Sequence, residues 1–284
     1  MNSSDLHHLT MLVPTHGRLL HTVRTARRRV APRPEPVSLM SEDRSILTLP
    51  SRPADRQVRY GDDPLHIADV WTSRRDGERA LLVLIHGGFW RPQYDRTHLG
   101  PMANALADEG YTVAAVEYRR VPGSPDLIVS DVRDACERVP VLLHSHAPTV
   151  VIGHSAGGHL ALYVAVASSA TPAGVVALAP VASLVEGEQR QLDTDAVRAF
   201  LGTSATERSD LDPCALPAPR TPVIIVHGTA DQIVPIDLSR TYCRRHPQTR
   251  LVALDQTGHF AVIDPRSSAW THVLAAIEAS YAHS

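Results

Sequence analysis

The sequence predicts an α/β fold in which helices cover both faces of a mostly parallel, doubly wound sheet. Short apolar segments rich in β-branched residues alternate along the chain with helical patterns of roughly ten to fifteen residues. Most of these apolar segments, such as residues 81–85, are continuous rather than alternating, which is typical of parallel strands buried on both faces. The length of 284 residues suits one large domain of this class.

The first part of the ordered chain predicts an antiparallel hairpin. Apolar residues tend to alternate between residues 46 and 71, and a Gly-Asp-Asp-Pro turn at 61–64 interrupts them. Residues 1–45 instead carry clustered arginines followed by prolines, so we expect a flexible tail there and an ordered domain over residues 46–284. No apolar stretch follows the arginines, so this tail does not predict an export signal.

Parallel strands and crossover helices alternate over the rest of the chain. After the strand at 81–85 the pattern predicts, in order, a helix at 98–109, a strand at 112–116, a helix at 126–143, a strand at 149–152, a helix at 156–167, strands at 174–178 and 222–226, a helix at 235–245, a strand at 250–254 and a helix at 268–281. The rhythm breaks over residues 182–216. We expect this insertion to form short helices that act as a small lid over the functional face of the sheet.

Four predicted strands end next to residues that carry chemistry. Ligands and catalytic groups gather at the carboxyl ends of strands in such a sheet, so we expect these residues to lie together. They are His-Gly-Gly-Phe-Trp at 86–90, Gly-His-Ser-Ala-Gly-Gly-His at 153–159, His-Gly-Thr-Ala-Asp at 227–231 and Gly-His-Phe at 258–260. Together they supply a glycine loop of the oxyanion-binding type, a serine, an acid and an imidazole.

Ser155 is the candidate nucleophile. It lies in a G-x-S-x-G pattern between an apolar strand and a helix, where Gly153 and Gly157 permit the sharp turn that exposes the hydroxyl. Asp231 and His259 follow in the chain order expected of the acid and the base of a catalytic triad. In such a triad the histidine takes the serine proton, and the acid holds the ring in the right tautomer.

Each of these residues also has a structural interpretation. Ser155 fits a glycine-rich turn with a serine facing solvent, and Asp231 fits an N-cap of the helix that follows it. Asp255 and Asp264 are rivals for the acid role. Asp231 is favoured because it lies just past a strand end, whereas Asp255 is too close to His259 in sequence to reach behind its ring easily.

The HGGFW and GHSAGGH motifs resemble those of the α/β-hydrolase superfamily, and most closely those of its esterase and kynurenine formamidase (arylformamidase) group. The resemblance covers roughly residues 58–280 and includes G-T-A-D-Q-I-V-P before G-H-F. It implies the α/β-hydrolase fold and the triad named above. Carried over residue by residue, it assigns the oxyanion donors to Gly88, Phe89 and Ala156.

We therefore expect a serine hydrolase, similar to a carboxylesterase or kynurenine formamidase, that cleaves a small carboxylic ester or (form)amide through an acyl-enzyme intermediate. A peptidase or acyltransferase with the same triad, and a non-catalytic ligand-binding protein on a hydrolase scaffold, stay open as alternatives. Phe89, Trp90 and Phe260 are the candidate pocket residues, although aromatic side chains often pack in cores. Arg91, Arg119 and Arg120 fit a substrate carboxylate or structural ion pairs, and ion pairs are favoured.

Composition argues against several other classes of protein. The net charge of -2 gives no electrostatic basis for binding nucleic acid, and no stretch approaches the roughly 18 apolar residues of a membrane span. Three widely spaced cysteines predict free thiols, a cytoplasmic location and no zinc ligand pair. His86 and His154 are expected to shape the active loops, and His144 and His146 lack the neighbours of a metal site. We expect no metal and no cofactor, and the sequence does not indicate an oligomeric state.

Overall fold

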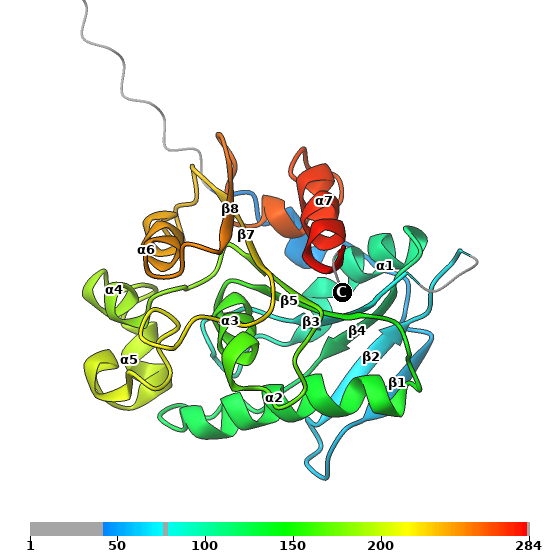
Figure 1. Cartoon of the computed structure of the whole chain (residues 1–284), viewed down its shortest axis with the longest axis horizontal. Helices are drawn as coiled ribbons and strands as arrows, with labels where there is room; N and C mark the ends of the chain where they lie inside the picture. Colours follow the sequence, from blue (N-terminus) through cyan, green and yellow to red (C-terminus); the bar gives the residue numbers. More distant parts are fainter. Residues whose placement is uncertain (1–41, 76–78, 283–284) are drawn as a thin grey trace, which may run out of the picture. The chain divides into compact units, whose positions relative to one another are not determined.

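The fold is built on an eight-stranded sheet with the strand order β1-β2-β4-β3-β5-β6-β7-β8 (Figure 1). The computed structural model describes residues 42–75 and 79–282, so most of the predicted tail lies outside the described residues. The strands are β1 (Arg56–Arg59), β2 (Ile67–Trp71), β3 (Leu81–Ile85), β4 (Thr112–Val116), β5 (Thr149–His154), β6 (Gly174–Leu178), β7 (Val223–Gly228) and β8 (Arg250–Leu254).

Antiparallel pairing occurs at the start of this sheet. The predicted hairpin is present, with Arg56 opposite Val70 and Arg59 opposite Ile67. Strand β2 then pairs antiparallel with β4, and every neighbouring pair from β4 to β8 is parallel. The predicted α/β class with a mostly parallel sheet is confirmed.

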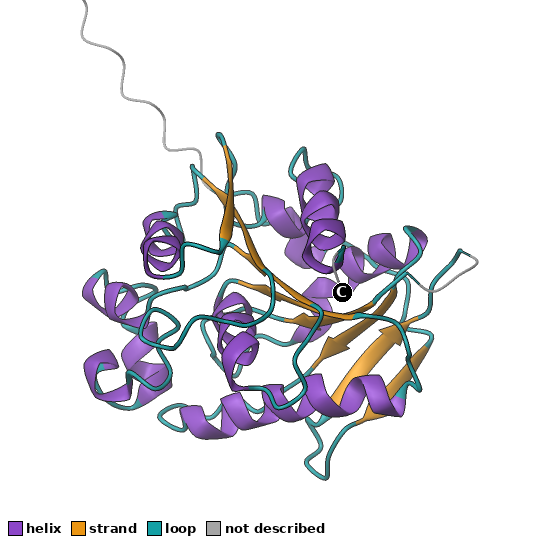
Figure 2. Cartoon of the chain, viewed as in Figure 1, coloured by secondary structure: helices purple, strands orange, loops and turns teal. Residues whose placement is uncertain are grey.

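Five longer helices cover both faces of the sheet (Figure 2). They are α1 (Gly100–Asp108), α2 (Pro125–Leu142), α3 (Ala156–Ala167), α6 (Asp237–Arg245) and α7 (Trp270–Tyr281). Because side chains alternate along a strand, Leu81, Val83 and Ile85 face one apolar core, while Leu82 and Leu84 face the other. Helices α2, α3 and α6 close the first core, and α1 and α7 close the second.

Short helices fill the segment between β6 and β7, as the break in the sequence pattern predicts. They are α4 (Leu184–Gln189), α5 (Ala196–Leu201) and the 3-10 turn η3 (Ala205–Arg208). Further 3-10 turns are η1 (Ser45–Thr48), η2 (Arg96–Leu99) and η4 (Ala261–Ile263). Asp193, between α4 and α5, lines the same cavity as Ser155, so this segment takes part in shaping the candidate site.

Two strands run further than their apolar runs predict. Strand β5 continues to His154 because this residue pairs with Leu178 of β6, and β7 continues to Gly228, which pairs with Leu254 of β8. Ladder pairing with a neighbour therefore extends both strands past the end of their apolar run. The result is that Ser155 follows the last residue of β5 directly.

Candidate active site

Ser155 forms the corner between β5 and α3. Its backbone has a φ of 57° and a ψ of -118°, a region that residues with a side chain rarely adopt. Such a conformation costs of order 1–3 kcal/mol and persists only where the surroundings hold it. Here the Ser155 N–H donates to Leu178 O at 2.8 Å, and the Ser155 carbonyl accepts from His159 N at 3.1 Å and Val181 N at 3.2 Å.

Two glycines make this corner possible by removing a side chain where backbones meet. A Cβ on Gly153 would overlap the carbonyl of Gly157, in the first turn of α3. A Cβ on Gly157 would overlap the carbonyl oxygens of Ile85 and His86, at the end of β3. The G-x-S-x-G spacing is therefore required by the close packing of α3 against β5 and β3.

Asp231 and His259 form a buried acid and imidazole pair. His259 Nδ1 lies 2.7 Å from Asp231 Oδ2, and the His259 side chain is only 2% exposed. Because the carboxylate oxygen accepts, Nδ1 carries the proton and Nε2 is left as a lone-pair acceptor. Burial alone raises the pKa of the Asp231 carboxyl, but hydrogen bonds from His227 and His259 outweigh it and hold that pKa well below its usual value.

The second oxygen of Asp231 fixes the orientation of the carboxylate. Oδ1 accepts the backbone N–H groups of Ile233 at 2.9 Å and Val234 at 2.8 Å, while His227 Nε2 lies 3.2 Å from Oδ2. The N-cap interpretation is wrong, because the N-cap of α6 is Ile236 and Asp231 Oδ1 instead holds the loop before that helix. The two rival acids have other partners: Asp255 accepts from Thr229, and Asp264 pairs with Arg266.

Ser155 and His259 line one hollow that encloses about 490 Å³ of atom-free space, including its opening to solvent. No hydrogen bond joins the two side chains within the described part of the chain, and such contacts are often long before substrate binds. The other lining residues come from segments far apart in the sequence: Arg44, Leu47, Gly88, Phe89, Tyr94, His98, His154, Asp193, Ile233 and Phe260.

The loop after β3 forms part of the wall of this cavity. Gly88, Phe89 and Trp90 have φ values of 106°, 51° and 56°, so three consecutive residues adopt the left-handed region. Gly88 and Phe89 line the cavity with Ser155. Ala156 is the first residue of α3, and its N–H is one of the donors that a helix N-terminus leaves without an intrahelical partner.

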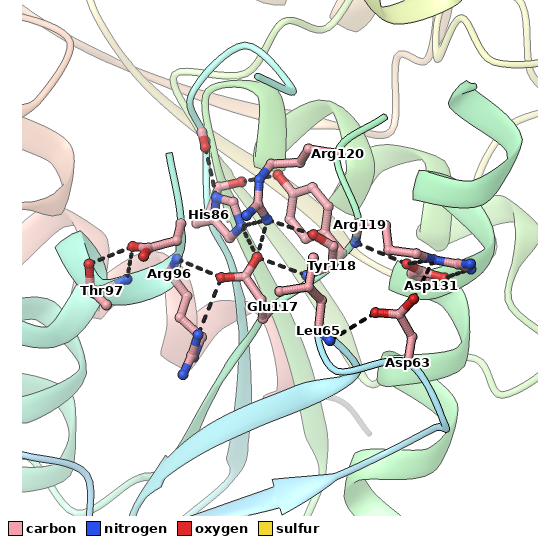
Figure 3. A network of polar contacts seen from close by, with 12 residues as sticks. Asp63, Leu65, His86, Arg96, Thr97, Glu117, Tyr118, Arg119, Arg120 and Asp131 are labelled. Atoms are coloured by element: carbon pink, nitrogen blue, oxygen red, sulfur yellow. Dashed lines mark hydrogen bonds and ion pairs between the residues drawn. The ribbon is translucent and has the colours of Figure 1, made fainter. Parts of the chain in front are cut away.

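A buried ionic network around Glu117 contacts the glycine loop through His86 (Figure 3). Glu117 lies among His86, Arg96 and Arg120, with His86 Nε2 at 3.1 Å and Arg96 NH1 at 3.3 Å from its carboxylate oxygens. The other ring nitrogen of His86 donates to Gly87 O at 2.8 Å, which ties the network to the glycine loop. Burial raises the pKa of Glu117, but His86 and Arg120 outweigh it and lower that pKa to about 2.

The three arginines considered for a substrate carboxylate are all paired within the protein. Arg120 pairs with Glu117, Arg119 makes a bidentate pair with Asp131, and Arg91 pairs with Asp193 at 2.8 Å. The structural interpretation of these arginines is confirmed. Sequence reasoning had no signal for Glu117 beyond an acid directly after the apolar run of β4.

Of the three candidate pocket residues, Phe89 and Phe260 line the cavity and Trp90 does not. The Trp90 indole is 2% exposed, stacks on Phe200 with ring centroids 4.4 Å apart and meets the edge of His159 at 5.3 Å. The structure therefore places Trp90 in the core, and Phe89 occupies the cavity wall in its place. The sequence does not reveal which of two consecutive aromatic residues in a tight loop turns inward.

His154 and His98 are further neighbours of the site. His154 Nε2 donates to the carbonyl oxygen of His259 at 3.1 Å, and burial lowers the pKa of His154 well below its usual value. Burial also lowers the pKa of His98, which lines the cavity, to about 4. Both rings are thus neutral near pH 7, and the expectation that His154 shapes the loops agrees with its contact to the His259 backbone.

The described residues contain no group of three or more histidine, cysteine or acidic side chains arranged to hold a metal ion. None of their helices is both long and apolar enough to cross a membrane.

Comparison with known proteins places the chain in a family. The BD-FAE family model matches residues 69–245. The chain is 36% identical to a kynurenine formamidase of Danio rerio over 110 residues, which are 38% of this chain and 37% of that protein. It is 24% identical to Esterase LipC of Mycobacterium tuberculosis over 234 residues, or 72% of this chain and 57% of that protein. The chain thus spans little more than a third of the length of the formamidase.

The solved structure of esterase Est2 from Thermogutta terrifontis with bound butyrate superposes on 79% of this chain and 92% of that one. The TM-score is 0.62 at 21% sequence identity, a likeness of fold. The family model covers more than half of the chain and includes the strand ends that carry Ser155 and Asp231. The chain therefore belongs to the BD-FAE family and has the α/β-hydrolase fold.

Proposed function

We propose that this protein is a serine hydrolase that cleaves a small carboxylic ester or (form)amide through an acyl-enzyme intermediate. The observation that carries the proposal is the Asp231 and His259 pair, joined at 2.7 Å, opening onto the same cavity as Ser155. The left-handed backbone of Ser155 and the glycine loop beside it support the same assignment. The names of the matched relatives, an esterase and a kynurenine formamidase, agree with the class of bond.

In the proposed reaction, Ser155 Oγ attacks the carbonyl carbon of the substrate while His259 Nε2 takes the hydroxyl proton. Asp231 holds the Nδ1 proton of the ring and stabilises the imidazolium that forms. The backbone N–H groups of Gly88, Phe89 and Ala156 are the proposed donors to the negative oxygen of the tetrahedral intermediate.

Collapse of this intermediate breaks the bond to the leaving group. His259 returns the proton to the departing alcohol or amine, which leaves the acyl group on Ser155. A water molecule then attacks the acyl carbon and gives its proton to the same nitrogen. The carboxylic acid departs, and the serine hydroxyl is restored.

The cavity supports a short acyl or formyl group as substrate. Its wall is partly apolar, because Phe89, Ile233 and Phe260 line it together with Ser155. Esterase and formamidase activity require the same attack at the carbonyl and differ in the leaving group. The proposed chemistry is therefore the same for both substrates, and the ratio of esterase to formamidase activity has to be measured.

A substrate panel tests this proposal. The wild type, Ser155→Ala and Ser209→Ala are assayed on p-nitrophenyl esters of rising chain length and on N-formylkynurenine. Ser209 is an exposed serine outside the cavity and serves as the matched control. We expect turnover of short esters or of the formamide that falls by at least about 10³-fold in Ser155→Ala and persists in Ser209→Ala. Undiminished turnover by Ser155→Ala would overturn the proposal, as would a wild type that cleaves none of the panel.

A further inference from the structure

A carboxylate from the segment before η1 reaches the loops that carry the acid and the base. Glu42 Oε1 accepts the backbone N–H of Gln232 at 2.8 Å, and its Oε2 accepts the backbone N–H of His259 at 2.8 Å. Gln232 directly follows Asp231, so one side chain joins the loop after β7 to the loop after β8. The sequence pattern assigns Glu42 to a tail, and it gives no sign of this contact.

We propose that Glu42 is a positioning residue that holds Asp231 and His259 in the geometry needed for proton transfer. This inference rests on the function proposed above. Glu42 does not line the cavity and so acts through the backbone of the two loops rather than through substrate. Its two hydrogen bonds are charge-assisted, because an ionised carboxylate accepts each of them.

The other links between these loops leave room for such a role. A backbone hydrogen bond from Ala230 N to Thr257 O joins the two loops, but it lies before Asp231 in one loop and before His259 in the other. The Asp231 and His259 side chains then meet each other, but a bond between two side chains cannot by itself fix the backbone that carries them. Glu42 supplies the missing backbone link at the two positions concerned.

Gly258 gives an independent sign that the contact is built into the loop. A Cβ on Gly258 would overlap the Glu42 carboxylate, so a residue with a side chain at this position would push the carboxylate away. The glycine of the G-H-F motif is thereby explained as the space through which Glu42 reaches the N–H of the next residue.

The same segment packs against the site at two further points. The Arg44 guanidinium carbon lies 5.4 Å from the centroid of the Phe260 ring, and Leu47 lines the cavity. Glu42 is therefore followed by residues that stay close to the histidine loop. The segment is therefore anchored beside the site on the C-terminal side of Glu42.

Glu42→Gln separates this role from a general effect on folding. The carboxamide keeps the shape of the side chain, but its NH₂ group must face one of the two backbone N–H groups, which leaves that donor unpaired. We expect kcat to fall roughly tenfold to a hundredfold, as a small misplacement of reacting groups does, while KM stays within about twofold. Asp43→Asn is the matched control, because within the described part of the chain this neighbouring carboxylate bonds Ser45 and contacts neither loop.

Two measurements accompany the kinetics. The first is the rate at which a fluorophosphonate labels the protein, and the second is the far-downfield proton resonance of the His259 Nδ1–H bound to Asp231. This resonance reports the geometry of the pair whether or not the protein turns over a substrate. We expect Glu42→Gln to slow labelling and to shift or broaden the resonance, and Asp43→Asn to change neither.

The outcomes distinguish this inference from the proposed function. A wild type that is neither labelled nor active, but whose resonance is altered by Glu42→Gln, refutes the hydrolase and supports the clamp. An active wild type whose kcat and resonance survive Glu42→Gln refutes the clamp, even if the melting temperature falls. A raised KM with an unchanged kcat also overturns the inference, since it assigns Glu42 to substrate binding.

Discussion

Replacing Asp231 by asparagine removes one charge and one acceptor from a carboxylate that is bound on both sides. Oδ2 faces the rings of His259 and His227, and Oδ1 accepts the backbone N–H groups of Ile233 and Val234. Asparagine has one oxygen and one NH₂ group. Its NH₂ group must therefore face either the histidine rings or the two backbone N–H groups, where the carboxylate had an acceptor oxygen.

The structure decides which side that is. The two backbone N–H groups are fixed donors, whereas an imidazole can move its proton to the other nitrogen. The asparagine oxygen therefore stays with Ile233 and Val234, and its NH₂ group donates to His259 Nδ1. The ring then carries its proton on Nε2, the atom that has to accept from Ser155. A loss of about 10⁴-fold in kcat follows, which is about 5.5 kcal/mol of barrier.

The assay is kcat on a short p-nitrophenyl ester, with melting temperature and circular dichroism to confirm that Asp231→Asn is folded. Asp255→Asn is the control, because Asp255 is the rival acid on the neighbouring loop and accepts from Thr229. We expect its kcat to stay within about threefold of wild type. Asp231 is not the orienting acid if folded Asp231→Asn keeps more than about a tenth of the wild-type kcat. The same conclusion follows if Asp255→Asn lowers kcat by as much as Asp231→Asn does.

Three further predictions concern the corner between β5 and α3, the buried His159 and the two aromatic residues Trp90 and Phe260. Gly157→Ala should lower soluble yield and melting temperature sharply, since its Cβ overlaps backbone oxygens of β3, and a variant as stable as wild type would refute the packing argument. Burial lowers the pKa of His159 to about 4, so the unfolded state takes up its proton first as pH falls below about 6.5. Urea unfolding should therefore show a loss of roughly 3 kcal/mol from this group between pH 6.5 and 4, and His159→Gln should flatten that dependence; an equal slope in both proteins counts against it. Trp90→Phe should lower stability and leave KM unchanged, whereas Phe260→Ala should raise KM; the reverse pattern would return Trp90 to the cavity wall.

The sequence predicted the fold well where one local signal decides the structure. The bounds of β3, β4 and α3 match the prediction because a continuous apolar run or an alanine-rich helical pattern carries all of the information. The ends of β5 and β7 were missed by two residues each. They depend on pairing with neighbouring strands, and that pairing is a property of the assembled sheet.

The candidate site divides in the same way. Ser155, Asp231 and His259 could be predicted as site residues because each follows a strand, and strand ends meet at one edge of a parallel sheet. Glu42 was missed because it lies 190 residues before Gln232, and no periodicity links the two positions. Glu117 was missed because an acid after a strand usually lies at the surface, and the sequence does not show the partners that bury it.

The most direct test of the account is covalent labelling of the protein by a fluorophosphonate, read by intact mass and peptide mapping. A serine activated by His259 and Asp231 should take up one adduct, located on Ser155, and Ser155→Ala should take up none. Asp231→Asn should be labelled far more slowly than wild type. An unlabelled wild type, or an adduct on another residue that persists in Ser155→Ala, would contradict the assignment of Ser155 as the nucleophile.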